Sequence, residues 1–417
     1  MSFGKTVTQR RIVWPKIKIG HVAMLLVGLI ASALSVAQSA ALIGLQIPIF
    51  RDLGSSFYSW RADQVFLAEK LFRETNQPTS EYLISSSRRI LAHSPTSARA
   101  MWLLAKGFES GGNPAGARRV MARADNLTRR DGAVQLWLGS DALRRREVAV
   151  GLDHFDKMLR TNPDAAMQML PRMVGVIAEP EGRAALLPYV RADNAWYEGM
   201  LGAALNSQLQ AADVSALLSA ATVLPDSKTA RSLYRNLVSK LANERSYRSL
   251  LQLWPKLPGA SDRAWQTIEP RPIVESEAYP PVDWSFAAFG NRRTELRELD
   301  GGEIGLEAFA SPGTTGVSAT KLLRPSDGAR SLEWRVIEQI SNPGGSAFWQ
   351  VTCINEPEEG DSVQSVNLLS EAQQRRRMRM DLPENCPFVR VDLRISGGIG
   401  REDSRLLIDG ILVSSQD

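Results

Sequence analysis

Five side chains near the C-terminus have residue types and a spacing that suit carbohydrate binding. Strands are predicted over 347–354 and 388–396, and alternate residues of a strand share one face. The candidate binding residues, all on outward faces, are Phe348, Gln350, Arg390, Asp392 and Arg394. An exposed ring offers a sugar an apolar platform, the amide and carboxylate bind hydroxyls, and arginines suit acidic substituents. The alternative is a solvated face on which Arg390 and Arg394 pair with Asp392.

Residues for enzymatic chemistry are sparse in this chain. Its three histidines, His21, His93 and His154, have no partners at the spacing of a catalytic triad or a metal site. The chain also has no glycine-rich phosphate loop, no Gly-x-Ser-x-Gly elbow and no His-Glu-x-x-His motif. We therefore predict no catalytic residue, no metal site and no cofactor, and we do not expect the protein to be an enzyme.

One acidic cluster follows the strand predicted over 347–354. It consists of Glu356, Glu358, Glu359 and Asp361. A loop of this composition could hold calcium through its oxygen atoms, although acidic loops are also commonly just solvated. The sequence leaves open whether this region binds sugar or calcium.

Two cysteines, Cys353 and Cys386, are the only ones in the chain. Two are too few for a fold built on disulfides. In an oxidising compartment they would pair and close a loop, which would stabilise the fold by roughly 3–4 kcal/mol. Free buried thiols are the alternative.

The elements that position these residues form a predicted all-β domain over 283–417. About ten short runs with a period of two, among them 347–354, 365–369 and 388–396, are separated by turn signals such as Gly301-Gly302 and Pro343-Gly344-Gly345. This pattern is typical of a β-sandwich, and we expect a jelly roll. Apolar sets such as Trp349, Val351 and Cys353 should face the core.

A helical domain is predicted over 61–257, where alanine, leucine and arginine dominate. Apolar and small residues in it recur with a period of 34 residues. The positions that carry the pattern are Leu104, Ala105, Ala117, Leu138, Gly139, Gly151, Phe155 and Pro163. This pattern resembles the tetratricopeptide repeat (TPR), whose helix pairs stack into a solenoid. Plain helical-bundle packing is the alternative.

The N-terminal region predicts export. Residues 19–41 form an apolar run without Asp, Glu, Lys or Arg, long enough to cross a bilayer, and the basic tail 1–18 precedes it. Positive charge keeps that end in the cytoplasm. We therefore expect a single-pass protein of the bacterial inner membrane with its bulk in the periplasm. A cleaved signal peptide is the alternative.

Two connecting segments complete the predicted domain order, a stalk over 42–60 and a proline-rich linker over 258–282. The formal net charge of +5 is matched by the basic residues before the anchor. An exported chain rarely meets nucleic acid, so we expect no nucleic-acid partner. The fold class is multidomain, with one transmembrane helix, an all-α TPR-like solenoid and an all-β sandwich.

This order, together with four short motifs, resembles the membrane-anchored TPR proteins of bacterial exopolysaccharide and capsule loci, whose C-terminal jelly roll is carbohydrate-binding-like. The motifs are Pro281-Val282-Asp283-Trp284, Phe348-Trp349-Gln350-Val351-Thr352-Cys353, Asn385-Cys386-Pro387 and Leu407-Ile408-Asp409-Gly410-Ile411. The resemblance implies a non-catalytic scaffold that binds protein partners of a polysaccharide export or assembly system. The alternatives are a protein that binds polysaccharide directly through the sandwich face, and a polysaccharide hydrolase or lyase.

Overall fold

The computed structural model describes residues 27–30, 32, 79–271, 278–324, 331–355, 358–370, 375–380, 382–383 and 386–414. Most of the predicted anchor over 19–41, and the whole predicted tail and stalk, lie outside these residues. Within the described part of the chain, no helix is long and apolar enough to cross a membrane.

The chain divides into two compact units after Asp141, inside the predicted repeat domain. From Thr79 onward, where its described part is continuous, the first unit contains three helices and most of a fourth. They are α4 (Ser80–His93), α5 (Ala98–Ser110), α6 (Pro114–Leu127) and α7 (Gly132–Arg144). Side-chain caps start these helices, as where Ser97 accepts a hydrogen bond from the Ala100 backbone and Asn113 from that of Gly116. Each cap satisfies a backbone N–H that lacks a partner within its helix.

The core of the first unit forms where small residues let its helices approach. A Cβ atom at Gly107 of α5 would lie 2.9 Å from Ile84 Cγ1 of α4, so glycine allows this contact. Ala105 and Ala117 are fully buried, and Leu104 is 8% exposed. Small side chains thus lie where the repeat pattern puts them.

The helix boundaries follow the predicted period. Helices α5 and α7 begin at Ala98 and Gly132, and α6 and α8 begin at Pro114 and Val148, the same spacing in both cases. Gly139 of α7 is buried and Leu138 is partly buried. In α8, Gly151 and Phe155 are buried, and Pro163 opens the turn that follows this helix.

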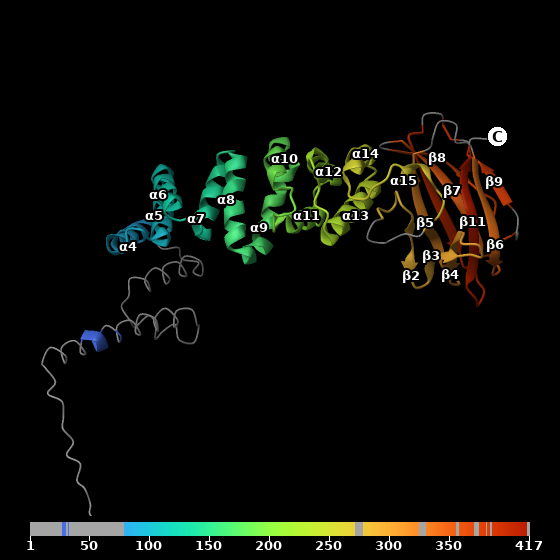
Figure 1. The fold of residues 1–417 in the computed structure, drawn as a ribbon, viewed down its shortest axis with the longest axis horizontal. Coiled ribbons are helices and arrows are strands. Elements are labelled where there is room, and N and C mark those ends of the chain that lie inside the picture. The colour runs from blue at the N-terminus through green and yellow to red at the C-terminus, as the bar shows by residue number, and fades with distance from the viewer. Residues whose placement is uncertain are drawn as a thin grey trace, which may run out of the picture. The chain divides into compact units, whose positions relative to one another are not determined.

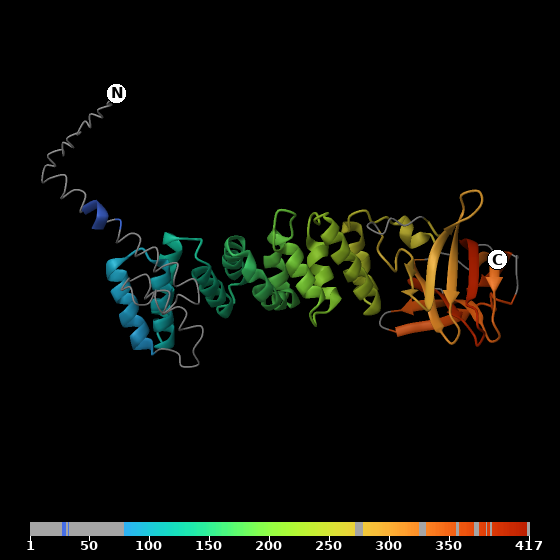
Figure 2. The ribbon, with the colours of Figure 1, turned by 90° about the horizontal axis from the view of Figure 1, so that it is seen from below.

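The second unit begins with a series of helices and short 3-10 turns. The α-helices are α8 (Val148–Thr161), α9 (Ala166–Met173), α10 (Pro180–Leu186), α11 (Tyr197–Leu205), α12 (Ala211–Ala220), α13 (Lys228–Asn243), α14 (Tyr247–Leu253) and α15 (Arg263–Gln266). The 3-10 turns are η2 (Pro163–Ala165), η3 (Val174–Ala178), η4 (Leu187–Tyr189) and η5 (Trp254–Lys256). Helix α13 packs against α11, α12 and α14, and Figure 2 shows these helices side by side in green to yellow.

An antiparallel β-sandwich completes the second unit, as the sequence predicts. The five-stranded sheet A has the order β1-β5-β10-β7-β8, and the six-stranded sheet B has the order β2-β3-β4-β11-β6-β9. The strands are β1 (Ser285–Phe286), β2 (Ala288–Phe289), β3 (Arg292–Glu298), β4 (Ile304–Ala310), β5 (Thr315–Leu323), β6 (Ser331–Ile340), β7 (Ser346–Asn355), β8 (Glu358–Gln364), β9 (Arg375–Arg379), β10 (Phe388–Ser396) and β11 (Ser404–Ser414). Strand β10 is the middle strand of sheet A, and β11 lies between β4 and β6 in sheet B.

The sandwich core is built by the apolar side of each strand. Trp349 and Val351 of β7 are fully buried, as are Val391 and Leu393 of β10. These residues alternate with the candidate binding residues, so the period of two assigns both faces correctly. Gly410, with φ at 56°, lies at a register shift in β11 and supplies a conformation that other residues adopt only with strain.

The disulfide joins Cys353 of β7 to Cys386, just before the neighbouring strand β10. The two Cα atoms are 5.7 Å apart. Because Cys353 pairs in register with Val389, the bridge lies where these two central strands of sheet A meet. The predicted pairing is therefore present.

The acidic cluster and the segment after it differ from prediction. Strand β8 begins at Glu358, so part of the expected loop is the edge strand of sheet A. A strand expected over 365–369 is instead a turn, in which the Asn367 carboxamide accepts hydrogen bonds from the Ala347 and Leu369 backbones. Such an asparagine favours a turn over a ladder.

Candidate functional site

The structure brings all five candidate binding residues together on the outer face of sheet A. In the register of β7 and β10, Gln350 lies opposite Asp392 and Phe348 lies opposite Arg394. Arg390 is on the same face of β10, two residues before Asp392. The predicted grouping of these residues on one surface is thus present, although their binding role stays a prediction.

This surface is not the open platform that the alternation of residues predicts. Asp392 is 4% exposed, and Phe388 on the same face of β10 is 3% exposed. The ring of Phe388 lies 5.3 Å from that of Tyr247 in α14 and 6.0 Å from that of Trp265 in α15. Helices therefore cover one end of β10, because these aromatic rings bury one another.

Five aromatic residues, which we name the aromatic seam, join the last helices to the sandwich. They are Tyr247, Trp254, Trp265, Tyr279 and Phe388. Trp254 contacts Trp265 edge-on at 5.3 Å and Tyr279 at 5.9 Å, an arrangement that aromatic rings prefer. The Tyr279 hydroxyl donates to the Pro258 carbonyl at 2.8 Å, and burial raises its pKa to about 12. Figure 1 shows α14 and α15 beside the sandwich.

A cavity of about 480 Å³ lies beside the seam, between the C-terminal end of α13 and sheet A. We name it the junction groove. Its polar lining from the helical side includes Ser239, Asn243, Arg245 and Tyr247, and from the sandwich Ser285, Thr320, Arg390, Asp392 and Arg394. The volume is in the range of small-molecule sites. Three of the five candidate residues thus line a cavity that is completed by helices.

Hydrogen bonds fix the charged groups of the junction groove. The Asp392 carboxylate accepts from Arg390 Nε at 2.9 Å and from Thr320 Oγ1 at 2.7 Å. Arg394 Nη1 lies 3.5 Å from the Gln350 amide oxygen. The expected pairing about Asp392 therefore forms with Arg390, whereas Arg394 contacts a neutral group.

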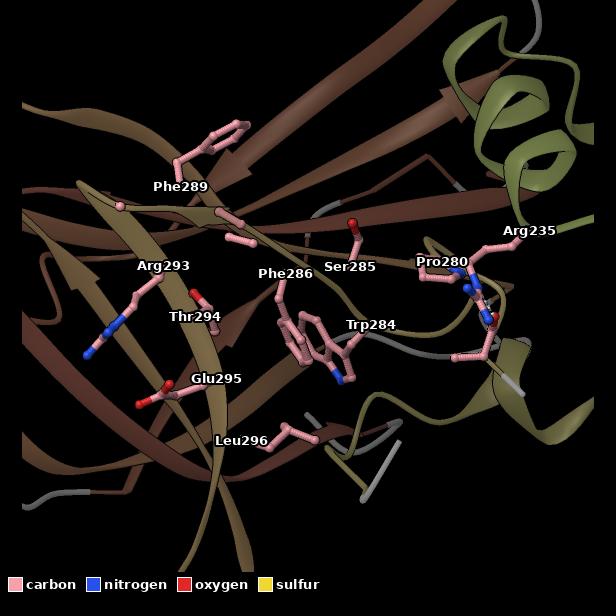
Figure 3. Close-up of a pocket in the computed structure, with 14 residues that line it drawn as sticks. Arg235, Pro280, Trp284, Ser285, Phe286, Phe289, Arg293, Thr294, Glu295 and Leu296 are labelled. Carbon is pink, nitrogen blue, oxygen red and sulfur yellow. Dashed lines mark hydrogen bonds between the residues drawn. The ribbon is translucent and has the colours of Figure 1, made fainter. Parts of the chain in front are cut away.

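A second cavity, of about 770 Å³, lies at the edge where β1, β2 and β3 meet; we name it the edge pocket. The rings of Trp284 and Phe286 stack at 6.1 Å on one side, and Figure 3 shows them lying against each other. Phe289 is 65% exposed and stands apart from this stack in Figure 3. Glu295 supplies the carboxylate of the lining.

The two cavities adjoin. Ser285 lines both of them. Helix α13 also borders both, through Arg235 at the edge pocket and Ser239, one turn later, at the junction groove. Arg235 Nε donates to the Ala278 carbonyl at 3.0 Å, and Ser239 Oγ donates to the Pro280 carbonyl at 3.1 Å. These bonds hold the end of the predicted linker, just before β1, against α13.

A buried lysine adds a further connection between the last helices and sheet A. Lys321 of β5 is 3% exposed, and its ammonium donates to the Ala264 carbonyl at 2.8 Å and to the Val282 carbonyl. Burial lowers the pKa of Lys321 to about 8, while nearby Asp283 partly opposes that change. The lysine therefore ties α15 and the end of the predicted linker to sheet A.

Sequence reasoning missed the residues that helices contribute to this site. Arg245 follows the C-cap of α13 with φ at 58°, and its helical position gave no reason to place it beside β10. Phe286 and Phe289 each lie in a strand of only two residues, which is too short for a period of two to assign their faces. A Pro280-Pro281 pair before the first strand was the available signal for a tight turn there.

Groups of three or more His, Cys, Asp and Glu side chains suited to a metal ion are absent from the described residues. Three members of the acidic cluster fall outside what the structure describes: Glu356 entirely, and Glu358 and Glu359 in their side chains.

Comparisons with known proteins assign no family. No family model matches the chain, and no curated protein matches it. Among solved structures, similarity is found to one described as "Structural basis for the promiscuous specificity of the carbohydrate-binding modules from the beta-sandwich super family". The identity is 12%, the TM-score is 0.22, and the match covers 31% of this chain and 52% of the other. The chain thus spans about half of that structure, and similarity at this level assigns no function.

Proposed function

We propose that this protein is a non-catalytic scaffold of a bacterial polysaccharide assembly and export system. Residues 19–41 anchor it in the inner membrane, and the bulk lies in the periplasm. The helix pairs, as TPR-type hairpins of a solenoid, hold protein partners along an extended surface, as helical repeats commonly do. The sandwich, a jelly roll in this proposal, stands next to the helices and meets the polymer or its exporter.

The observation that carries this proposal is the aromatic seam. A flexible linker would leave the helices and the sandwich independent, whereas rings packed at 5.3 Å from α14 to β10 make one compact unit. Backbone carbonyls bound by Arg235, Ser239 and Lys321 add to this connection. A scaffold needs such a connection, because it positions one partner relative to another.

Gene deletion and complementation in the native bacterium test this function. We expect deletion to reduce surface polysaccharide while the level of the polymerising enzymes stays unchanged. Complementation with the intact gene should restore the polymer, whereas Trp265→Ala in the seam should restore less of it at equal protein level. Unchanged polymer after deletion would reject the scaffold. Purified protein should also leave the polymer's chain length unaltered, since we propose no catalysis.

A second candidate function, direct binding of carbohydrate, is favoured by the two adjoining cavities. The edge pocket offers the Phe286 and Phe289 rings, and the junction groove offers arginines and hydroxyl groups. Apolar walls with a few polar groups are typical of ligand sites. Affinity electrophoresis of the full-length protein in gels containing purified host polysaccharide tests this function. Mobility equal to that in a gel without polymer would reject it.

A further inference from the structure

The junction groove carries more positive than negative charge. Its lining holds three guanidinium groups, on Arg245, Arg390 and Arg394, and one carboxylate, on Asp392. Both oxygens of that carboxylate already accept hydrogen bonds, one from Arg390 and one from Thr320. Asp392 therefore neutralises Arg390 and leaves the charge of Arg394 without a carboxylate partner in the groove.

Arg394 is the residue with the clearest excess charge. Its contact is the neutral amide oxygen of Gln350 at 3.5 Å, and within the described residues it forms no ion pair. The side chain is partly buried and lines the cavity, so water screens it less than it screens a surface arginine. Such a guanidinium is suited to a carboxylate ligand, which its two parallel N–H groups can bind together.

We propose that the junction groove binds the carboxylate of an acidic saccharide. This inference rests on the second candidate function, carbohydrate binding, and specifies its substrate class. Arg394 binds the carboxylate from the sheet, and Arg245 approaches from the end of α13. Ser239, Asn243 and Ser285 supply the polar groups that the sugar hydroxyls need.

The adjoining edge pocket explains why the ligand is a saccharide rather than a small anion. A free anion needs only the arginines, whereas Ser285 connects the groove to a larger cavity with the Phe286 ring in its wall. An aromatic face packs against the apolar face of a sugar ring. A saccharide with one acidic unit in the junction groove can place its next unit in the edge pocket.

The backbone conformation of Arg245 allows its side chain to be removed without straining the helix end. Its φ of 58° is in the left-handed region, which glycine adopts without strain and which most residues avoid. Glycine is also the common residue one position past a helix C-cap. Arg245→Gly should therefore remove the guanidinium and leave the end of α13 intact.

Calorimetric titration of the full-length protein in detergent with trigalacturonate, maltotriose and inorganic phosphate tests the proposal. We expect trigalacturonate to bind about tenfold or more tightly than neutral maltotriose, because charged hydrogen bonds are the stronger ones. Arg394→Gln and Arg245→Gly should each weaken trigalacturonate binding by about tenfold, and added salt should weaken it further. Arg401→Gln, an exposed arginine that lines neither cavity, is the matched control and should bind as wild type does.

Each other outcome overturns a defined part of the proposal. Equal binding of maltotriose and trigalacturonate rejects the acidic specificity but leaves carbohydrate binding standing. Phosphate binding as tight as trigalacturonate, with the same loss in Arg394→Gln, shows an anion site and rejects the saccharide. Wild-type affinity in both arginine variants rejects the groove. If the protein binds neither saccharide, both this inference and the second candidate function fail, while the scaffold is tested separately by complementation.

Discussion

Tyr247 of α14 packs against Phe388 of β10 with ring centroids 5.3 Å apart, and this contact couples the helical region to the sandwich. Both side chains are buried, at 3% exposure each. Phe388 is on the outward face of its strand, where a solvated residue is usual. One contact thus converts part of a sheet surface into an internal boundary, and the junction groove lies beside it.

Removing the ring of Phe388 should uncouple the unfolding of the helical region from that of the sandwich. We expect Phe388→Ala to lower the free energy of unfolding by about 3–5 kcal/mol, because a large buried side chain leaves a cavity. Calorimetry should then show the sandwich and the helices unfolding as two transitions. Phe289→Ala is the control, since Phe289 is 65% exposed, and should change stability by about 0.5 kcal/mol or less. Equal effects of the two variants would contradict the role of the seam.

Loss of the disulfide should weaken the sandwich. The bridge closes a loop with a sequence separation of 33 residues, and the entropy of such a loop corresponds to about 3–4 kcal/mol. We expect the double variant Cys353→Ala with Cys386→Ala to lose this amount in denaturant unfolding. Reduced wild-type protein should match the double variant, and reductant should leave the double variant unchanged. Stability of the wild type that does not respond to complete reduction would refute the prediction.

Lys321 should give the stability a pH dependence of known sign. Its pKa is about 8 in the folded protein and near the ordinary value of 10.5 when unfolded. Between these values the unfolded chain binds more protons, so the contribution of Lys321 to stability becomes more favourable as the pH rises. The slope is at most about 1.4 kcal/mol per pH unit.

Comparison with Lys321→Met isolates this effect from other titrating groups. The difference in unfolding free energy, wild type minus variant, should rise from pH 7.5 to pH 9.5, a window that lies mostly between the two pKa values. A difference that stays constant, or falls, over this window would show that the lysine is not held as the structure places it.

Thr320 of β5 and Asp392 of β10 should be energetically coupled through their hydrogen bond. Asp392→Asn should cost about 1–3 kcal/mol, since the carboxylate is buried and accepts charged and hydroxyl donors. A double-mutant cycle with Thr320→Val should give a coupling of about 1 kcal/mol. Pairing Asp392→Asn with Arg401→Gln instead should give additive effects, because Arg401 is exposed and shares no hydrogen bond with Asp392. Additivity in the first cycle would argue against the bond.

Local patterns predicted much of the second unit's sandwich. The period of two placed Val391 and Leu393 inside and Arg390 and Asp392 outside, because alternation follows from strand geometry whatever the partner strand. It failed at 365–369, where side-chain hydrogen bonds of Asn367 make a turn out of an apolar stretch. Apolar composition alone does not distinguish a strand from such a turn.

The sequence by itself determined which residues are apolar, which faces of β7 and β10 they occupy, the 34-residue spacing of the helices and the two cysteines available to pair. Only the tertiary structure decided that α13 and α14 lie against sheet A, and hence that Arg245 and Arg394 line one cavity. The physical reason is that the two kinds of information act over different separations along the chain. Periodicity records the environment along one element, whereas docking depends on the complementarity of surfaces far apart in the chain, here the rings of Tyr247 and Phe388.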